Sequence, residues 1–252
     1  MIRRNCVLAI SAIALAAVPF AAAQTNGGGA AAMRLMAMGD DAGIVQGQPC
    51  VVVEKLERVT PLADGTTLTR NWEEQKWRDS QGRFRKQETE IESGKDPVFH
   101  AVTIVDPVAN TLVTLNLDRK TATVFHLPTQ GPAALHPWVS PFEEPLMARE
   151  GVQVKTEKLE GRTIAGVYAV GRRVTRIRPP GTIGNDKPVV SVAERWISPD
   201  LKIMLETTLD DPREKQVRLV TQLDRSAPDP SVFAIPADFT VKDVDITQQA
   251  QK

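Results

Sequence analysis

The feature that most constrains this fold is a long series of strand-like runs separated by turn-forming residues about every eight to twelve positions. The connectors contain Gly, Pro, Asp or Ser, as in Asp64-Gly65 and Ser198-Pro199-Asp200. The eleven runs are Val51–Val59, Thr66–Arg78, Arg83–Glu92, Phe99–Val105, Thr111–Leu117, Thr121–Leu127, Val152–Lys158, Thr163–Arg178, Val189–Ile197, Leu201–Leu209 and Gln216–Leu223. Eleven runs are too many for a small sandwich. We therefore predict a mainly β protein with one strongly curved antiparallel sheet, an unclosed β-barrel.

The N-terminal residues have the pattern of a secretory signal peptide. Arg3 and Arg4 precede an apolar run that ends in Ala21-Ala22-Ala23, so we expect cleavage near Ala23 and a periplasmic or secreted protein. Beyond this run no apolar stretch is long enough to span a bilayer, and we expect at most peripheral contact with a membrane. The mature chain would carry 29 Lys and Arg against 31 Asp and Glu, which gives no basic excess for nucleic acid.

The rest of the chain divides by composition. We expect a flexible lead at 24–48, a single β domain at 49–245 and a disordered tail at 246–252. A proline-rich insertion at 128–150 interrupts the β pattern. Within it Ser140-Pro141-Phe142-Glu143 predicts a helix that runs toward Arg149. In the lead, the apolar residues of Met33–Met38 are typical of packing, and a short lid helix is the alternative. One or two short helices would thus cover the sheet.

The sequence contains no recognisable catalytic or metal-binding motif. It lacks the nucleophile elbow, the paired-cysteine motif, the zinc-protease motif and the phosphate-binding loop. His100, His126 and His136 are widely spaced, and we predict surface histidines with no metal and no cofactor. Cys50 is the one cysteine after cleavage, so no internal disulfide can form. We expect it to be partly buried at the start of a strand; a nucleophile or an intermolecular disulfide is the alternative.

Two strands carry charges of one sign along one face. Glu88, Glu90 and Glu92 share a face of their strand, as do Arg172, Arg176 and Arg178 of another. Cross-strand ion pairs on a solvated face explain both patterns. The alternative is that the arginine stripe receives an acidic headgroup or an anionic partner.

Several motifs together resemble the LolA/LolB superfamily of periplasmic lipoprotein carriers and a group of uncharacterised secreted acidobacterial proteins. The matching segments are Asp106–Leu112, Leu117–Thr121, Trp196–Leu201, Leu219–Leu223 and Pro228–Phe239. The resemblance implies an open β-barrel whose concave face is covered by short helices and accommodates acyl chains. This chain is longer than the carriers, has the insertion at 128–150, and has no single residue that matches the carriers' functional arginine.

We therefore predict an exported, non-enzymatic protein that binds a lipid or an acylated protein in an apolar cleft. Large aromatic residues are the candidate lining: Trp72, Trp77, Phe99, Phe125, Trp138 and Trp196. The alternative is an envelope module for protein–protein interaction that uses strand edges and the arginine stripe. A hydrolase is a third alternative, without a recognisable nucleophile–base pair.

Overall fold

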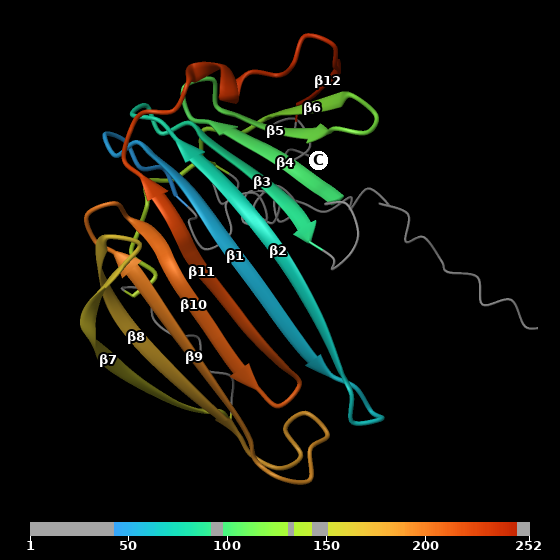
Figure 1. Cartoon of the computed structure of the whole chain (residues 1–252), viewed down its shortest axis with the longest axis vertical. Coiled ribbons are helices and arrows are strands. Elements are labelled where there is room, and N and C mark those ends of the chain that lie inside the picture. The colour runs from blue at the N-terminus through green and yellow to red at the C-terminus, as the bar shows by residue number, and fades with distance from the viewer. Residues whose placement is uncertain (1–42, 92–97, 131–133, 143–150, 246–252) are drawn as a thin grey trace, which may run out of the picture.

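The computed structural model describes residues 43–91, 98–130, 134–142 and 151–245. These residues form a single sheet of twelve strands with the order β12-β6-β5-β4-β3-β2-β1-β11-β10-β9-β8-β7 (Figure 1). The strands are β1 Cys50–Pro61, β2 Thr67–Arg78, β3 Phe84–Ile91, β4 Val98–Asp106, β5 Thr111–Asn116, β6 Thr121–His126, β7 Gln153–Ile164, β8 Val167–Arg178, β9 Val189–Ser198, β10 Ile203–Asp211, β11 Glu214–Asp224 and β12 Thr240–Asp245. One 3-10 helix, η2, spans Pro230–Phe233 in the described part of the chain.

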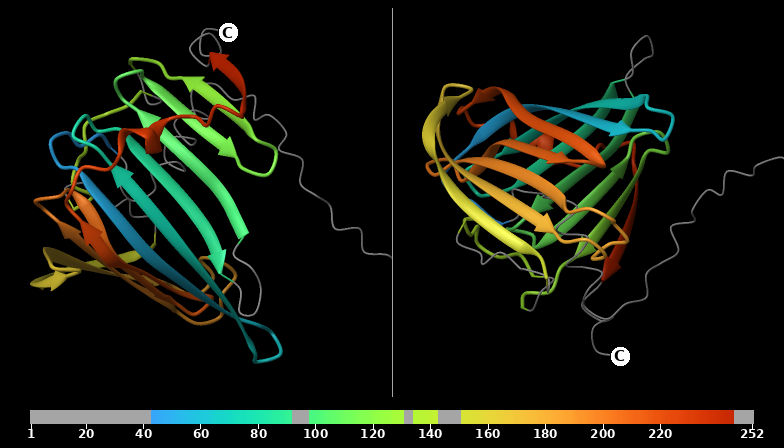
Figure 2. Two further views of the ribbon diagram at one scale, coloured as in Figure 1. Left: turned by 45° about the horizontal axis from the view of Figure 1, so that its top comes forward. Right: turned by 90° about the horizontal axis from the view of Figure 1, so that it is seen from below.

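The sheet is strongly curved and does not close. Its two halves bend toward one another, and the edge strands β7 and β12 do not pair (Figure 2). This confirms the predicted mainly β, open-barrel fold. The alternative helix at Met33–Met38 and the helix predicted toward Arg149 lie outside the described residues, apart from the start of the second, where the N–H of Phe142 donates to Ser140 Oγ (3.3 Å).

The eleven predicted runs correspond to β1–β11, with two differences. β12 was not expected, and it pairs in parallel with β6, unlike the other pairings among the described strands. The turn between the seventh and eighth strands, predicted between Lys158 and Thr163, lies instead between Ile164 and Val167. β7 continues past Gly161 with a shift of register between Leu159 and Arg162, and the Tyr168 ring lies where a side chain at Gly161 would be. The chain reverses at Ala165-Gly166, where φ is 47° and 78°.

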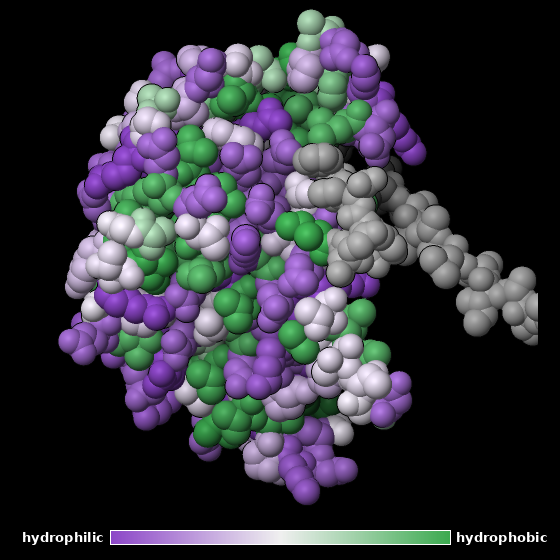
Figure 3. All heavy atoms as spheres, in the orientation of Figure 1, coloured by the Kyte–Doolittle hydropathy of each residue, from purple (hydrophilic) through white to green (hydrophobic). Residues whose placement is uncertain are grey.

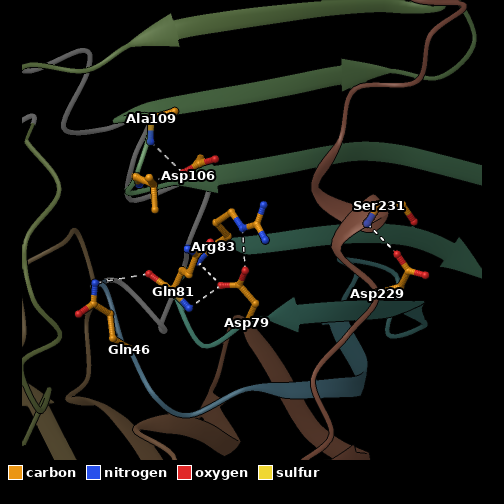
Figure 4. Close-up of polar contacts among 9 residues, drawn as sticks. Gln46, Asp79, Gln81, Arg83, Asp106, Ala109, Asp229 and Ser231 are labelled. Carbon is orange, nitrogen blue, oxygen red and sulfur yellow. Dashed lines mark hydrogen bonds and ion pairs between the residues drawn. The ribbon is translucent and has the colours of Figure 1, made fainter.

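Local hydrogen bonds that aspartate side chains accept hold the turns, as the turn sequences predict. Asp79 Oδ1 accepts from the backbone N–H of Gln81 (3.0 Å) and of Arg83 (2.9 Å), and its Oδ2 accepts from Arg83 Nε (2.6 Å) (Figure 4). Asp229 caps η2 by accepting from the N–H of Ser231 (2.8 Å). These bonds fix where the chain turns. The turns in turn fix the register of neighbouring strands, and the register decides which residues share a face of the sheet.

Alternation along each strand separates the two faces. In β1 Val52, Glu54 and Leu56 are buried, whereas Lys55 and Glu57 are exposed. We call the face of Glu54 the inner face and the opposite face the outer face. The register carries this assignment from strand to strand across the sheet.

Each face of the β3–β6 region is covered by a different segment. On the inner face, Ile44 and Leu135 pack against an apolar cluster of Phe84, Val105, Leu112 and Leu127. The two covering segments join through the N–H of Ile44, which donates to the carbonyl of His136 (2.8 Å), and the N–H of Trp138, which donates to the carbonyl of Ile44 (3.0 Å). On the outer face, η2 packs through Phe233 against a second cluster that includes Val102, Ile104, Val113 and Leu115.

Candidate functional site

A hollow of about 460 Å³ lies at the end of the sheet where β1, β9 and β10 meet their turns. We call it the end hollow, and its lining residues are Val59, Pro61, Thr67, Val190, Val192, Asp210, Asp211, Pro212 and Lys215. The register aligns Val59 with Lys215, Lys215 with Asp210, and Asp210 with Val192. These four residues therefore form one row on the outer face.

Exposed apolar side chains occur at the strand ends and turns near the end hollow, two of them, Leu62 and Leu68, next in the chain to the lining residues Pro61 and Thr67. Leu62 and Leu68 of the β1–β2 hairpin, Ile183 of the β8–β9 loop and Val190 of β9 are each between 43% and 47% exposed. The hairpin and the loop both lie at the lower end of the molecule (Figure 1), where apolar residues occur among polar ones on the visible face (Figure 3). A concentration of large exposed apolar side chains at one end of a sheet is typical of a contact or ligand site.

The charged groups of the end hollow are already partnered. Asp211 is buried, and its carboxylate accepts from Arg213 Nε (2.8 Å) and lies 3.5 Å from Arg178 Nη1. The hydrogen bond from the Arg213 side chain lowers the pKa of Asp211, against the opposing effect of burial. Asp210 pairs with Lys215 at 3.5 Å. The groups free to meet a ligand are therefore the apolar ones, Val59, Val190 and Val192 among them.

The inner face of the central strands carries a buried charge network instead of an apolar lining. Lys76 Nζ lies 2.8 Å from Glu54 Oε1 and 3.2 Å from Glu74 Oε1. Lys86 Nζ approaches Glu74 Oε2 at 3.4 Å. Arg218 Nη1 lies 3.7 Å from Glu54 Oε2 and 3.6 Å from Glu74 Oε1. The network joins strands β1, β2, β3 and β11.

Glu74 is ionised within this network. Burial alone would raise the pKa of Glu74, but the positive charges of Lys76, Lys86 and Arg218 outweigh burial and lower that pKa. A carboxylate and an ammonium that are both removed from water need such partners to remain charged. This part of the inner face therefore contributes fixed, compensated charges.

The structure does not bring the six predicted aromatic residues together. Trp72 lies on the inner face below Arg58, and Phe125 packs on the inner apolar cluster. Trp77 packs on the outer cluster beneath Arg85, and Trp196 lies on the outer face beneath Arg162. Trp138 is half-buried in a covering segment, and Phe99 belongs to β4, with its side chain outside the described residues. None of the six lines the end hollow.

The arginine stripe lies on the inner face of β8. The guanidinium of Arg172 donates to the carbonyls of Pro141 (2.8 Å) and Phe142 (2.9 Å) and lies over the Phe142 ring at 4.7 Å. Arg178 is beside Asp211. The register places Arg195 of β9 directly opposite Arg172. Arg195 was missed by the sequence analysis, because only the pairing of β8 with β9 brings its charge to the stripe.

The cysteine and one of the histidines named in the sequence analysis lie in parts of the sheet where they pack or pair with neighbouring residues. Cys50 is fully buried at the start of β1. His126 Nε2 lies 3.0 Å from Asp243 Oδ1 between β6 and β12, a contact that only the unexpected β12 provides. Among the described residues, no cluster of three or more His, Cys, Asp or Glu could hold a metal. No helix in the described part of the chain is long and apolar enough to cross a membrane.

No family model matches the sequence, and no curated protein matches it. Solved structures that match include three of interest. A domain described as an outer membrane lipoprotein-sorting protein from Vibrio parahaemolyticus is 7% identical, with a TM-score of 0.29 over 74% of this chain and 89% of its own. A LolA superfamily protein from Nitrosomonas europaea is 9% identical, with a TM-score of 0.31 over 83% and 98%. LprF from Mycobacterium bovis is 12% identical, with a TM-score of 0.29 over 82% and 99%.

One of the three is thus named after the superfamily that the sequence motifs resemble.

Proposed function

We propose that this protein is an exported, non-enzymatic binding protein that holds a lipid-like ligand or the acyl chain of a partner, and that the end hollow is the binding site. The observation that carries the proposal is the apolar end hollow with its exposed apolar rim. Its volume of about 460 Å³ lies in the range of small-molecule sites, about 300–1,000 Å³.

The energetics favour an acyl chain over a polar ligand. Each CH₂ group moved out of water contributes about 0.8 kcal/mol, and the valine and proline side chains of the end hollow offer an apolar surface for such groups. The carboxylates of the end hollow are held in ion pairs with Arg213, Arg178 and Lys215. Export is supported by the signal-peptide pattern of residues 1–23.

A neutral fluorophore tests the proposal without interference from charge. We expect N-phenyl-1-naphthylamine to bind the mature chain saturably, and Val190→Asp to weaken that binding about tenfold, or roughly 1.4 kcal/mol, because a carboxylate would replace an apolar lining group. Val241→Asp is the matched control. Val190 and Val241 are exposed to a similar extent, 44% and 48%, but Val241 lies on the edge strand β12. Equal effects of the two substitutions would contradict the assignment of the end hollow.

Native mass spectrometry of the protein purified from its own cell envelope tests the rest of the proposal. We expect a chain that begins near Gln24 and carries an extractable lipid or acylated peptide. A protein that is empty and also fails to bind the neutral fluorophore would favour the protein–protein interaction module instead.

A further inference from the structure

A row of cationic side chains crosses the inner face from β7 to β11. The register aligns, in order, Lys158, Arg172, Arg195, Thr207 and Arg218. Side chains directly opposite one another in a sheet have Cβ atoms about 4.5–5.5 Å apart. Like charges in that position destabilise the sheet. The pairs Lys158–Arg172 and Arg172–Arg195 therefore lower the stability of the folded protein.

The outer face of the same strands has the opposite arrangement. Arg173 is directly opposite Glu194, and Arg173 Nη2 lies 2.7 Å from Glu194 Oε1. Arg162 of β7 likewise pairs with Glu206 of β10. These strands therefore compensate their outer charges with partners of opposite sign. The next pair along β8 and β9, Arg172 and Arg195 on the inner face, has two charges of the same sign.

Among the described residues, the row members Lys158, Arg172 and Arg195 have no acidic partner, and neither has Arg176, which lies four residues further along the same face of β8. Among the residues that the structure describes, no carboxylate lies within 4.0 Å of the side-chain nitrogens of Lys158, Arg176 or Arg195. Arg172 donates to the backbone carbonyls of Pro141 and Phe142, and among the described residues it has no carboxylate within 4.0 Å. Burial lowers the pKa of Arg172, and the nearby positive charges of Arg195 and Arg176 lower it further. Arg172, directly opposite Arg195 and on the same face of β8 as Arg176, therefore lies close enough to be repelled by both.

Two buried polar atoms of the row also lack a hydrogen-bond partner in the structure. They are Arg172 Nε and Thr207 Oγ1. A buried polar group without a partner costs about 1–3 kcal/mol. Unpartnered donors and repelling guanidinium groups in the same row are both stabilised by an anion.

We propose that Lys158, Arg172, Arg176 and Arg195 form a binding site for a phosphate group on the inner face, with Thr207 beside it. The planar guanidinium group binds phosphate oxygens through two parallel hydrogen bonds. The phosphate is either free or the headgroup of an acidic amphiphile.

The phosphate site is separate from the end hollow and goes beyond the proposed function. Val192 of the end hollow and Arg195 of the row are three residues apart on β9, and therefore point to opposite faces. Asp210 of the end hollow and Thr207 of the row are also three residues apart, on β10, and point to opposite faces. A failure of one site therefore leaves the other testable.

Calorimetric titration of the mature chain with inorganic phosphate, with dodecyl phosphate below its micellar concentration and with neutral dodecyl maltoside tests the site. We expect phosphate-bearing ligands to bind and Arg195→Gln to weaken that binding at least tenfold. Arg173→Gln is the matched control, because it removes the same charge from the outer face of the neighbouring strand. Arg173→Gln should change phosphate binding less than twofold.

Thermal unfolding separates loss of the site from loss of the fold. Arg195→Gln removes a repelling charge, so we expect its melting temperature to rise by about 1–3 °C while phosphate binding falls. Dodecyl phosphate that binds at least tenfold more tightly than inorganic phosphate would identify the headgroup as the source, and similar affinities would identify the free anion. The proposal is overturned if neither phosphate binds, if Arg195→Gln leaves the binding of inorganic phosphate unchanged, or if Arg195→Gln and Arg173→Gln weaken binding equally. Binding of the neutral fluorophore should be unaffected by Arg195→Gln.

Discussion

At the scale of single residues, Glu74 is the acid on which the inner charge network depends. Its carboxylate is fully buried and lies within 3.6 Å of cationic atoms of Lys76, Lys86 and Arg218. We expect Glu74→Gln to lower the free energy of unfolding by about 3–5 kcal/mol, because it leaves buried cations without compensation. Urea unfolding at pH 7 measures the loss.

The neighbouring residue provides the control for this substitution. Glu73→Gln also removes one carboxylate from β2, but from the outer face, where Glu73 is only half-buried. We expect a change within about 0.5 kcal/mol. A loss for Glu73→Gln as large as that for Glu74→Gln would contradict the special role of the inner network.

The same carboxylate predicts how stability depends on pH. The pKa of Glu74 in the folded protein is below the ordinary value of 4.5. Its ionised form therefore stabilises the fold fully above pH 4.5, and this contribution is lost as pH falls from there through the lowered pKa. We expect the difference between the unmodified protein and Glu74→Gln to shrink below pH 4.5, and a constant difference would argue against it.

At the scale of elements, the β7–β8 hairpin places an alanine, Ala165, in a left-handed backbone conformation that alanine disfavours. Ala165 has a φ of 47° and is followed by Gly166 with a φ of 78°, the backbone of a two-residue turn that favours Asn-Gly. Ala165→Asn should raise the free energy of unfolding by about 0.5–1 kcal/mol, measured by urea unfolding. Ala109→Asn in the β4–β5 turn, where φ is not positive, should give no such gain. If Ala165→Asn and Ala109→Asn raised the free energy of unfolding equally, the gain could not come from the backbone conformation of Ala165.

The elements show what the sequence could and could not predict. Alternation and turn residues predict β1–β11, because each signal is local. The break predicted between Lys158 and Thr163 is misplaced because the constraint on Gly161, the ring of Tyr168, comes from the next strand. β12 was missed because it is short and pairs with β6 only after the chain has crossed the outer face.

The candidate sites depend still more on contacts between distant segments. The end hollow combines Val59, Val190 and Pro212, which no periodicity connects. The arginine stripe could be placed on one face of its strand, but its neighbour Arg195 needed the register of β8 with β9. The charge network likewise joins four strands, so its members are invisible to a pattern read along one strand.

At the scale of the whole molecule, the open sheet presents two chemically different surfaces. The end hollow lies among apolar side chains at the turn end of β1, β9 and β10. The phosphate site lies on the opposite face, toward the segment that contains Pro141 and Phe142. Since the sheet separates them, each surface should bind its own ligand without influence from the other.

A double-mutant cycle with Val190→Asp and Arg195→Gln tests this independence. We expect the double variant to bind the neutral fluorophore as weakly as Val190→Asp alone, and to bind inorganic phosphate as weakly as Arg195→Gln alone. The interaction free energy should stay below about 0.5 kcal/mol for either ligand, as it does for separate sites without shared partners. The same cycle with dodecyl phosphate is the sharper measurement, because this ligand has both an apolar chain and a phosphate. A coupling above about 1 kcal/mol would mean that one amphiphile reaches around the end of the sheet and contacts both surfaces.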